Sequence, residues 1–263
     1  MNNLRVTLVQ GDTRWHDPDG NRDYYGGLID SLHGLTDLVL LPETFTSGFS
    51  NDAIGQAETM DGPTVDWMRA HAARLDAAVC GSVQLRDGDS VFNRLLFVTP
   101  GGAVQTYDKR HLFRHAGEHE RYAAGRERLI VEWRGWRICP QVCYDLRFPV
   151  FARNRFHATR GLDYDLLVFV ANWPAVRSYP WKTLLRARAI ENLCYVAGLN
   201  RVGTDGNGLR YDGDSAVIDF LGHPVSECTD EEVVSTTTLL RAELDAHRER
   251  FPAMLDADAF ELT

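Results

Sequence analysis

The sequence predicts an α/β fold in which mixed β-sheets are buried beneath helices. Strand-like and helix-like segments alternate along part of the chain, and elsewhere successive strands pair as hairpins. Two segments, DLVLLPE (37–43) and YDLLVFVAN (164–172), are nearly continuous apolar runs, which are typical of strands buried on both faces. The 263 residues contain no repeat, low-complexity stretch or long linker, so we expect a single domain over 1–263.

The N-terminal half is expected to contain two helices. The first extends from near Asp19 to Leu32, and the second covers 61–75, where Pro63 stands at a first-turn position before apolar residues at helical spacing. Strands are predicted at 4–10, 37–43, 77–83, 91–99 and 103–109, with a Pro-Gly-Gly turn before the last.

The C-terminal half continues the same pattern. Residues 128–143 are predicted to form a strand, an Arg-Gly turn and a second strand, and a long helix is expected over 179–194. Further elements are predicted at 164–172 (strand), 195–200 (strand), 213–224 (strand and turn) and 241–251 (helix).

Composition excludes several classes of protein. The net charge of −9 argues against nucleic-acid binding, which needs a basic face. No apolar run approaches the roughly 20 residues of a membrane helix, and the N-terminus enters a strand without a signal-peptide core. Five cysteines are an odd number at low density, which favours reduced thiols. We therefore expect a cytoplasmic protein that binds neither membranes nor nucleic acid.

Three predicted strands end on reactive side chains, namely Glu43, Lys109 and Cys143. Chemistry in α/β proteins gathers where strands end, so the three groups could converge. Each residue could instead have no catalytic role. Glu43 would then be a solvated loop carboxylate, Lys109 a surface lysine, and Cys143 a buried thiol that packs as a small hydrophobic side chain. Together the three residues could form a catalytic set. A thiol with a pKa of about 8.5 is mostly protonated at neutral pH, so a cysteine nucleophile needs a nearby base to remove its proton.

In such a set Glu43 takes the thiol proton. Lys109 favours the thiolate form of Cys143 and stabilises the oxyanion of the tetrahedral intermediate. The backbone N–H of Tyr144, which follows the cysteine, offers a second oxyanion donor. The protonated glutamate then delivers a proton to a leaving amine. Such a set cleaves a carbon–nitrogen bond through a thioester.

Three segments of the sequence resemble the three blocks of the nitrilase (carbon–nitrogen hydrolase) superfamily, in chain order. They are LLPETFTSGF (40–49), YDKRHLFRHAGEHERYAAG (107–125) and CPQVCYDLRFP (139–149), and ANWP (171–174) with the helix after it resembles the segment that follows the nucleophile. The resemblance implies a four-layer α-β-β-α sandwich that forms a homodimer or higher homo-oligomer. It makes Glu43 the general base, Lys109 the oxyanion-stabilising cation and Cys143 the nucleophile.

Within this superfamily the sequences of these segments are most similar to those of bacterial omega-amidases. That similarity implies hydrolysis of small 2-oxo dicarboxylate monoamides (2-oxoglutaramate, 2-oxosuccinamate), with no cofactor expected. Nitriles, N-carbamoyl compounds and other small amides remain alternative substrates, because the same trio serves them all. A non-catalytic binding protein on the same fold is the other class, but a decayed copy would be expected to lose a member of the trio.

The resemblance also implies a second glutamate, which the family often uses to position the lysine and the substrate amide. Glu118 and Glu120 are both candidates. Glu118 fits the family spacing better, because it stands seven residues before Gly125 with Tyr122 between them.

Other candidates concern substrate binding. Arg147 suits a substrate carboxylate, although an ion pair with Asp145 is an equal alternative. Trp173 and Phe45 are candidate pocket walls, although an aromatic side chain in the core is the commoner case. His115 is a candidate at the pocket mouth.

A metal site is not expected. Cys139 and Cys143 lie four residues apart, or about 13 Å along a strand, which is too far to share an ion. His111, His115 and His119 recur at helical spacing, but Gly117 interrupts the run. Cys139 is expected to be a buried, inert thiol.

Overall fold

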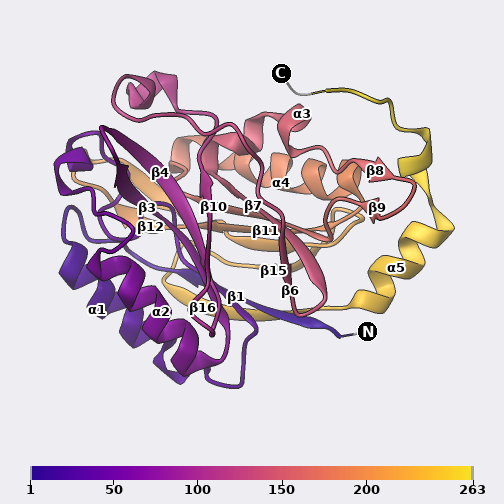
Figure 1. Cartoon of the computed structure of the whole chain (residues 1–263), viewed down its shortest axis with the longest axis horizontal. Coiled ribbons are helices and arrows are strands. Elements are labelled where there is room, and N and C mark those ends of the chain that lie inside the picture. The colour runs from indigo at the N-terminus through magenta and orange to yellow at the C-terminus, as the bar shows by residue number, and fades with distance from the viewer. Residues whose placement is uncertain (1, 262–263) are drawn as a thin grey trace.

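The computed structural model, which describes residues 2–261, contains two mixed six-stranded sheets enclosed by helices (Figure 1). The first sheet has the order β16 (Val233–Leu239), β1 (Leu4–Gln10), β2 (Leu38–Leu40), β3 (Ala78–Asp87), β4 (Ser90–Val98) and β5 (Val104–Asp108). The second has the order β15 (Pro224–Glu227), β14 (Ala216–Ile218), β11 (Tyr195–Asn200), β10 (Leu166–Ala171), β7 (Trp136–Val142) and β6 (Val131–Trp133).

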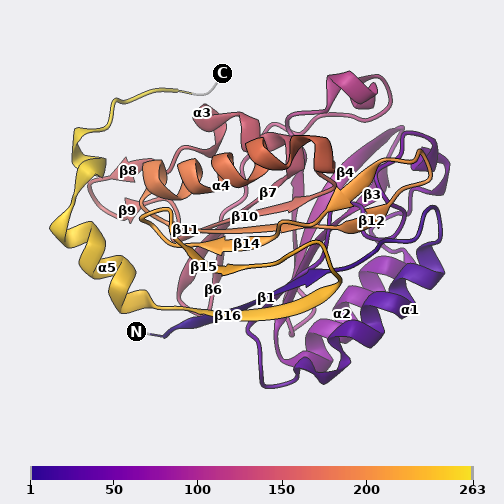
Figure 2. The same ribbon diagram turned by 180° about the vertical axis from the view of Figure 1, so that it is seen from behind.

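Helices cover the outer faces of the two sheets. Helices α1 (Pro18–Ile29) and α2 (Pro63–Leu75) lie on the first sheet, and α3 (Pro149–Ala152) and α4 (Ser178–Asn192) lie beside the second (Figure 2). The predicted α-β-β-α sandwich is thereby confirmed. Helix α5 (Arg241–Arg250) follows β16 at one end of the molecule. Within residues 2–261, each helix is too short or too polar to cross a lipid bilayer.

Shorter elements complete the described chain. Two hairpins are formed by β8 (Phe156–His157) with β9 (Gly161–Leu162) and by β12 (Val202–Thr204) with β13 (Arg210–Asp212). The 3-10 turns are Asp30–Leu32, Asp52–Gln56, Arg114–Ala116, Glu118–Glu120, Cys143–Arg147, Ala175–Arg177 and Ala253–Asp256.

The apolar runs are explained by burial on both faces of the sheets. In β2, Leu38 and Leu40 belong to the core between the two sheets, whereas Val39 packs in a second core beneath α1 and α2. Strand β10 is buried at all six positions, between the other sheet and α4. Consecutive apolar residues are needed wherever a strand has no solvent-exposed face.

Two differences from the predicted elements have local causes. The strand expected over 37–43 pairs regularly only over Leu38–Leu40, because Pro42 cannot donate a ladder hydrogen bond. Strand β16 was not predicted, and neither were the short elements β8, β9, β12, β13, β15 and α3. The Ser- and Thr-rich sequence of β16 alternates in burial at the sheet edge, where it pairs antiparallel with β1. The other predicted strands and helices are confirmed, with ends shifted by a few residues.

Gly198 of β11 should be essential for packing α4 on the second sheet. A Cβ atom there would lie 2.5 Å from Leu185 Cδ1, so we expect Gly198→Ala to lower the free energy of unfolding by about 1–3 kcal/mol. Gly27→Ala in α1 is the control, since a Cβ there meets open space and should raise stability by roughly 0.5–1 kcal/mol. Urea denaturation measures both changes, and equal effects of the two variants would contradict the packing argument.

Candidate active site

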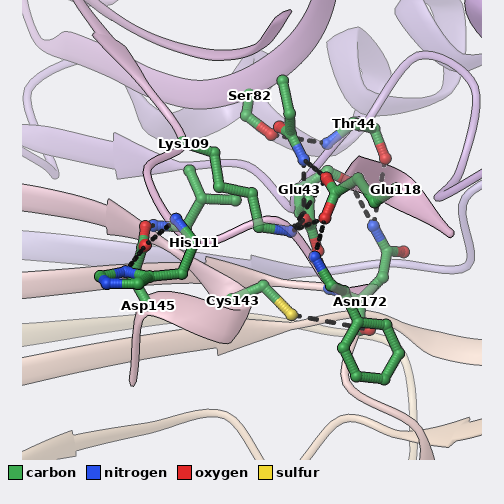
Figure 3. Close-up of polar contacts among 12 residues, drawn as sticks. Glu43, Thr44, Ser82, Lys109, His111, Glu118, Cys143, Asp145 and Asn172 are labelled. Atoms are coloured by element: carbon green, nitrogen blue, oxygen red, sulfur yellow. Dashed lines mark hydrogen bonds and ion pairs between the residues drawn. The ribbon is translucent and has the colours of Figure 1, made fainter. Parts of the chain in front are cut away.

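The three reactive strand ends meet in one cavity between the sheets (Figure 3). Glu43 lies just beyond β2 and Lys109 directly after β5, both in the first sheet, whereas Cys143 directly follows β7 of the second. All three side chains line a cavity of about 520 Å³. Because the sheets face one another, residues 100 positions apart in the chain become neighbours.

Glu43 is fully buried and receives hydrogen bonds from both sheets. Its Oε1 accepts from Lys109 Nζ at 2.9 Å and from Asn93 Nδ2 at 2.8 Å, and its Oε2 accepts from the backbone N–H of Asn172 at 2.8 Å. The Asn172 amide also donates to the backbone oxygen of Glu43 at 2.6 Å. These donors replace the water that a buried carboxylate loses.

Lys109 is held between two carboxylates. Its Nζ lies 2.9 Å from Glu43 Oε1 and 2.9 Å from Glu118 Oε2, and all three side chains are at most 1% exposed. Burial opposes the charged ammonium, but the negative charges of Glu118 and Glu43 outweigh it and raise the pKa of Lys109. Burial, opposed by Lys109 and reinforced by Glu43, raises the pKa of Glu118. The lysine is therefore a fixed cation.

The structure brings Glu118 to this cluster and leaves Glu120 outside. Glu118 is buried, and its Oε2 also accepts from the Phe113 N–H at 2.6 Å, whereas the Glu120 side chain is 73% exposed. Gly125 holds the segment against the end of β5, because its N–H donates to the Lys109 carbonyl and a Cβ there would collide with the Asp108 backbone.

Cys143 has an unusual backbone conformation. Its φ of 44° is in the left-handed region, which non-glycine residues adopt at a cost and mostly at functional sites. The thiol lies 3.8 Å from the Asn172 carbonyl and lines the cavity. Burial and then the negative charge of Glu43 raise the pKa of Cys143 well above its usual value, although Lys109 opposes the shift. The resting site thus holds a neutral thiol.

Asp145 fixes the turn that carries Cys143. Its buried carboxylate accepts from the Val142 N–H at 3.0 Å, from Tyr107 Oη at 2.7 Å and from the His111 N–H at 3.0 Å. The Tyr144 N–H lies in the first turn of the 3-10 helix Cys143–Arg147, where N–H groups have no intrahelical acceptor.

The other predicted binding residues divide into two groups. Tyr144, Arg147, Trp173 and His115 all line the cavity. Arg147 makes no ion pair with Asp145; its guanidinium lies 4.9 Å from the centre of the Trp173 ring. The placement of Phe45 at the pocket was wrong.

Phe45 lies in the core beneath the helices, with its ring 5.8 Å from Tyr25 and 5.7 Å from Trp67. Thr44 causes this, because its φ of 42° interrupts the alternation that would place Phe45 on the same side as Glu43.

Sequence reasoning missed several residues that build the site. Asn93 and Asn172 hold Glu43, and only their polar character within or after apolar runs could have indicated them. Arg177, Asp205 and Tyr211 also line the cavity. Within residues 2–261, no three His, Cys, Asp or Glu side chains gather in a way that would hold a metal ion.

Comparisons with known proteins match the whole chain. The family model described as carbon-nitrogen hydrolase matches residues 5–249. The chain is 48% identical to Omega-amidase YafV of Yersinia enterocolitica over 263 residues, covering 100% of both chains. It is 32% identical to 2-oxoglutaramate amidase of Bacillus subtilis, covering 91% of this chain and 90% of that one.

A solved structure matches equally completely. It is a CN-hydrolase superfamily protein of Xanthomonas campestris with an arsenic adduct in its active site. The two chains are 69% identical and superpose with a TM-score of 0.99, each covered to 100%.

Glu43 should control the ionisation of the Cys143 thiol. We expect Glu43→Gln to lower the pKa of Cys143, because it removes a neighbouring negative charge and leaves Lys109 in place. Ultraviolet absorbance of the thiolate against pH measures this. Each protein is referenced to the same protein carrying Cys143→Ala, which subtracts the other cysteines. An unchanged or higher pKa would rule out the electrostatic account.

Proposed function

The chain belongs to the carbon–nitrogen hydrolase family, and on that premise we propose that it is an omega-amidase. Its substrates are small 2-oxo dicarboxylate monoamides, such as 2-oxoglutaramate and 2-oxosuccinamate, which it converts to the 2-oxo acid and ammonia. The full-length similarity to proteins named for this activity supports the proposal. The observation that carries it is the cavity in which Glu43, Lys109 and Cys143 lie together with the arginine Arg147.

The first half-reaction forms a thioester. Glu43 takes the proton from Cys143 Sγ as the sulfur attacks the amide carbonyl carbon. The resulting oxyanion accepts hydrogen bonds from Lys109 Nζ and the Tyr144 N–H. The carbon–nitrogen bond then breaks as Glu43 returns its proton to the leaving nitrogen. Ammonia leaves, and the acyl group remains on the sulfur.

The second half-reaction consumes one water molecule. Glu43 removes a proton from water as the oxygen attacks the thioester carbonyl, and the same two donors bind the oxyanion. The carbon–sulfur bond breaks, the thiolate regains its proton from Glu43, and the acid leaves. Glu118 positions Lys109 throughout, because both of its oxygens contact Nζ, at 3.1 and 2.9 Å.

Arg147 supplies the charge that the proposed substrate needs. Within the described chain its guanidinium has no hydrogen bond or ion pair, and it lies over the Trp173 ring at the cavity wall. A planar guanidinium binds a carboxylate with two parallel hydrogen bonds. Arg147 therefore binds the substrate carboxylate.

We also propose a cytoplasmic homo-oligomer. All five cysteines are free thiols, which suits a reducing compartment. Several large apolar side chains on or beside α4 are exposed, including Tyr179 at 80% and Ile190 at 52%, and contact with a second copy would cover them. Sedimentation velocity distinguishes this assembly from a monomer.

A substrate panel tests the proposed activity. We expect kcat/KM to be highest for 2-oxoglutaramate and 2-oxosuccinamate, and at least tenfold lower for a neutral amide of the same length, for which Arg147 has no charged partner. Ammonia release measures the amides, and a nitrile and an N-carbamoyl compound complete the panel. A preference for either of the latter two would replace the proposed substrate class.

Cys143 and Cys139 provide a matched pair of variants for the assignment of the nucleophile. Cys143→Ala should abolish ammonia release, a loss of 10³-fold or more that is on the order of that for other covalent nucleophiles. Cys139→Ala should retain most activity, because Cys139 is buried and does not line the cavity. Mass spectrometry of the quenched reaction should find the acyl group on the Cys143 peptide. Equal losses, or an adduct elsewhere, would contradict the assignment.

A further inference from the structure

A second arginine, Arg177, lines the same cavity and has no anionic partner in the described chain. It ends the 3-10 turn Ala175–Arg177 that leads into α4. Its side chain makes no hydrogen bond or ion pair with the described residues. Its guanidinium lies 5.6 Å from the centre of the Phe113 ring. No sequence motif indicates Arg177, and the two half-reactions proposed above do not involve it.

The position of Arg177 is built into the pocket wall. The Arg177 carbonyl accepts the indole N–H of Trp173 at 2.8 Å, so the ring beneath Arg147 also holds the backbone of Arg177. Phe113, beneath the Arg177 guanidinium, packs edge-on against Tyr144 at 5.0 Å, and Tyr144 follows the nucleophile. The rings of Trp173 and Phe113 therefore support the guanidinium groups of Arg147 and Arg177 in the cavity that contains Cys143.

The remaining charged groups of the cavity already have partners. Lys109 forms ion pairs with Glu43 and Glu118, and Asp205 accepts from two backbone N–H groups and from Tyr211 Oη. Arg121 lies 3.9 Å from Asp52 and is mostly exposed. Arg147 and Arg177 are thus the two lining guanidinium groups without an anion. Two like charges in one cavity repel unless an anion lies between them.

We propose that Arg177 is a specificity-determining residue that binds the 2-oxo acid end of the substrate together with Arg147. This inference rests on the proposed omega-amidase function. A 2-oxo carboxylate offers three acceptor oxygens, two on the carboxylate and one on the adjacent ketone. A plain carboxylate offers only two, which a single guanidinium can satisfy. Two arginines therefore favour the 2-oxo acid over the corresponding monoamide that lacks the ketone.

Steady-state kinetics of Arg177→Gln test this role with three substrates: 2-oxoglutaramate, the same monoamide without the ketone, and a neutral amide of equal length. We expect KM for 2-oxoglutaramate to rise ~10- to 100-fold, as for loss of a hydrogen bond to a charged group. The rise should be smaller for the monoamide without the ketone and smallest for the neutral amide. The change in kcat should be smaller than that in KM, because the substitution leaves Glu43, Lys109 and Cys143 in place.

Two further variants separate charge from structure. Arg177→Lys retains the charge without the planar fork and should recover part of the lost affinity. Arg186→Gln removes a charge from α4, the helix that follows Arg177, at a position outside the cavity where Arg186 pairs with Glu227, and should leave KM unchanged. An equal change of KM for all three substrates in Arg177→Gln, or no change for any, would overturn the proposal.

A binding measurement keeps this inference distinct from the proposed function. Calorimetry on the Cys143→Ala protein, with and without Arg177→Gln, uses 2-oxoglutarate as the probe. If the parent protein hydrolyses no 2-oxo monoamide, the proposed function fails. Arg177 is then still judged by whether its substitution weakens binding of the 2-oxo acid about tenfold or more. Unaltered binding would refute the role of Arg177 even in an active omega-amidase.

Discussion

The buried cluster of Glu43, Lys109 and Glu118 determines which other groups the active site must contain. Two carboxylates and one ammonium, each at most 1% exposed, carry a net negative charge in a region without bulk water. Such a cluster is stable only when each remaining lone pair finds a donor. Those donors come from separate elements: Asn93 from β4, the Phe113 N–H from the loop after β5, and Asn172 from the end of β10.

This requirement also fixes the two sheets relative to each other. Glu43 belongs to the first sheet and Asn172 to the second, so the bonds between them cross the sandwich. A second crossing joins Tyr107 of β5 to Asp145 in the turn after β7. Because Tyr107 precedes Lys109 by two residues and Asp145 follows Cys143 by two, this bond sets the position of the lysine relative to the sulfur. The left-handed backbone of Cys143 is held by the same carboxylate.

Much of this arrangement could be predicted from the sequence, because strands buried on both faces leave a clear apolar pattern. A charged residue or a cysteine at the end of such a run is then conspicuous, as at Glu43 and Cys143. The limits of pattern reasoning appear where the backbone departs from regular geometry. Phe45 would share a face with Glu43 in a continued strand, but the positive φ of Thr44 turns it into the helix-covered core.

Arg177 could not be predicted for a different reason. Whether an arginine has a partner depends on contacts between segments distant in sequence, and neither composition nor spacing indicates them. The same holds for Arg147, whose two interpretations the sequence left equal. Arg147 forms no ion pair with Asp145, whose carboxylate accepts hydrogen bonds from Tyr107, Val142 and His111. Only the folded chain reveals that the arginine lacks an acid in the described structure.

The charge of the buried cluster explains why the proposed thiol chemistry needs a neutral resting sulfur. With Cys143 protonated, the site carries one net negative charge, and ionisation alone would add a second in a medium of low dielectric constant. Transfer of the thiol proton to Glu43 avoids this, since the negative charge moves from the carboxylate to the oxygen of the substrate. The total charge then remains constant while its location approaches Lys109. A fixed cation and a mobile proton therefore suffice for the proposed attack, because the negative charge moves from Glu43 to the substrate oxygen and the total charge of the site does not change.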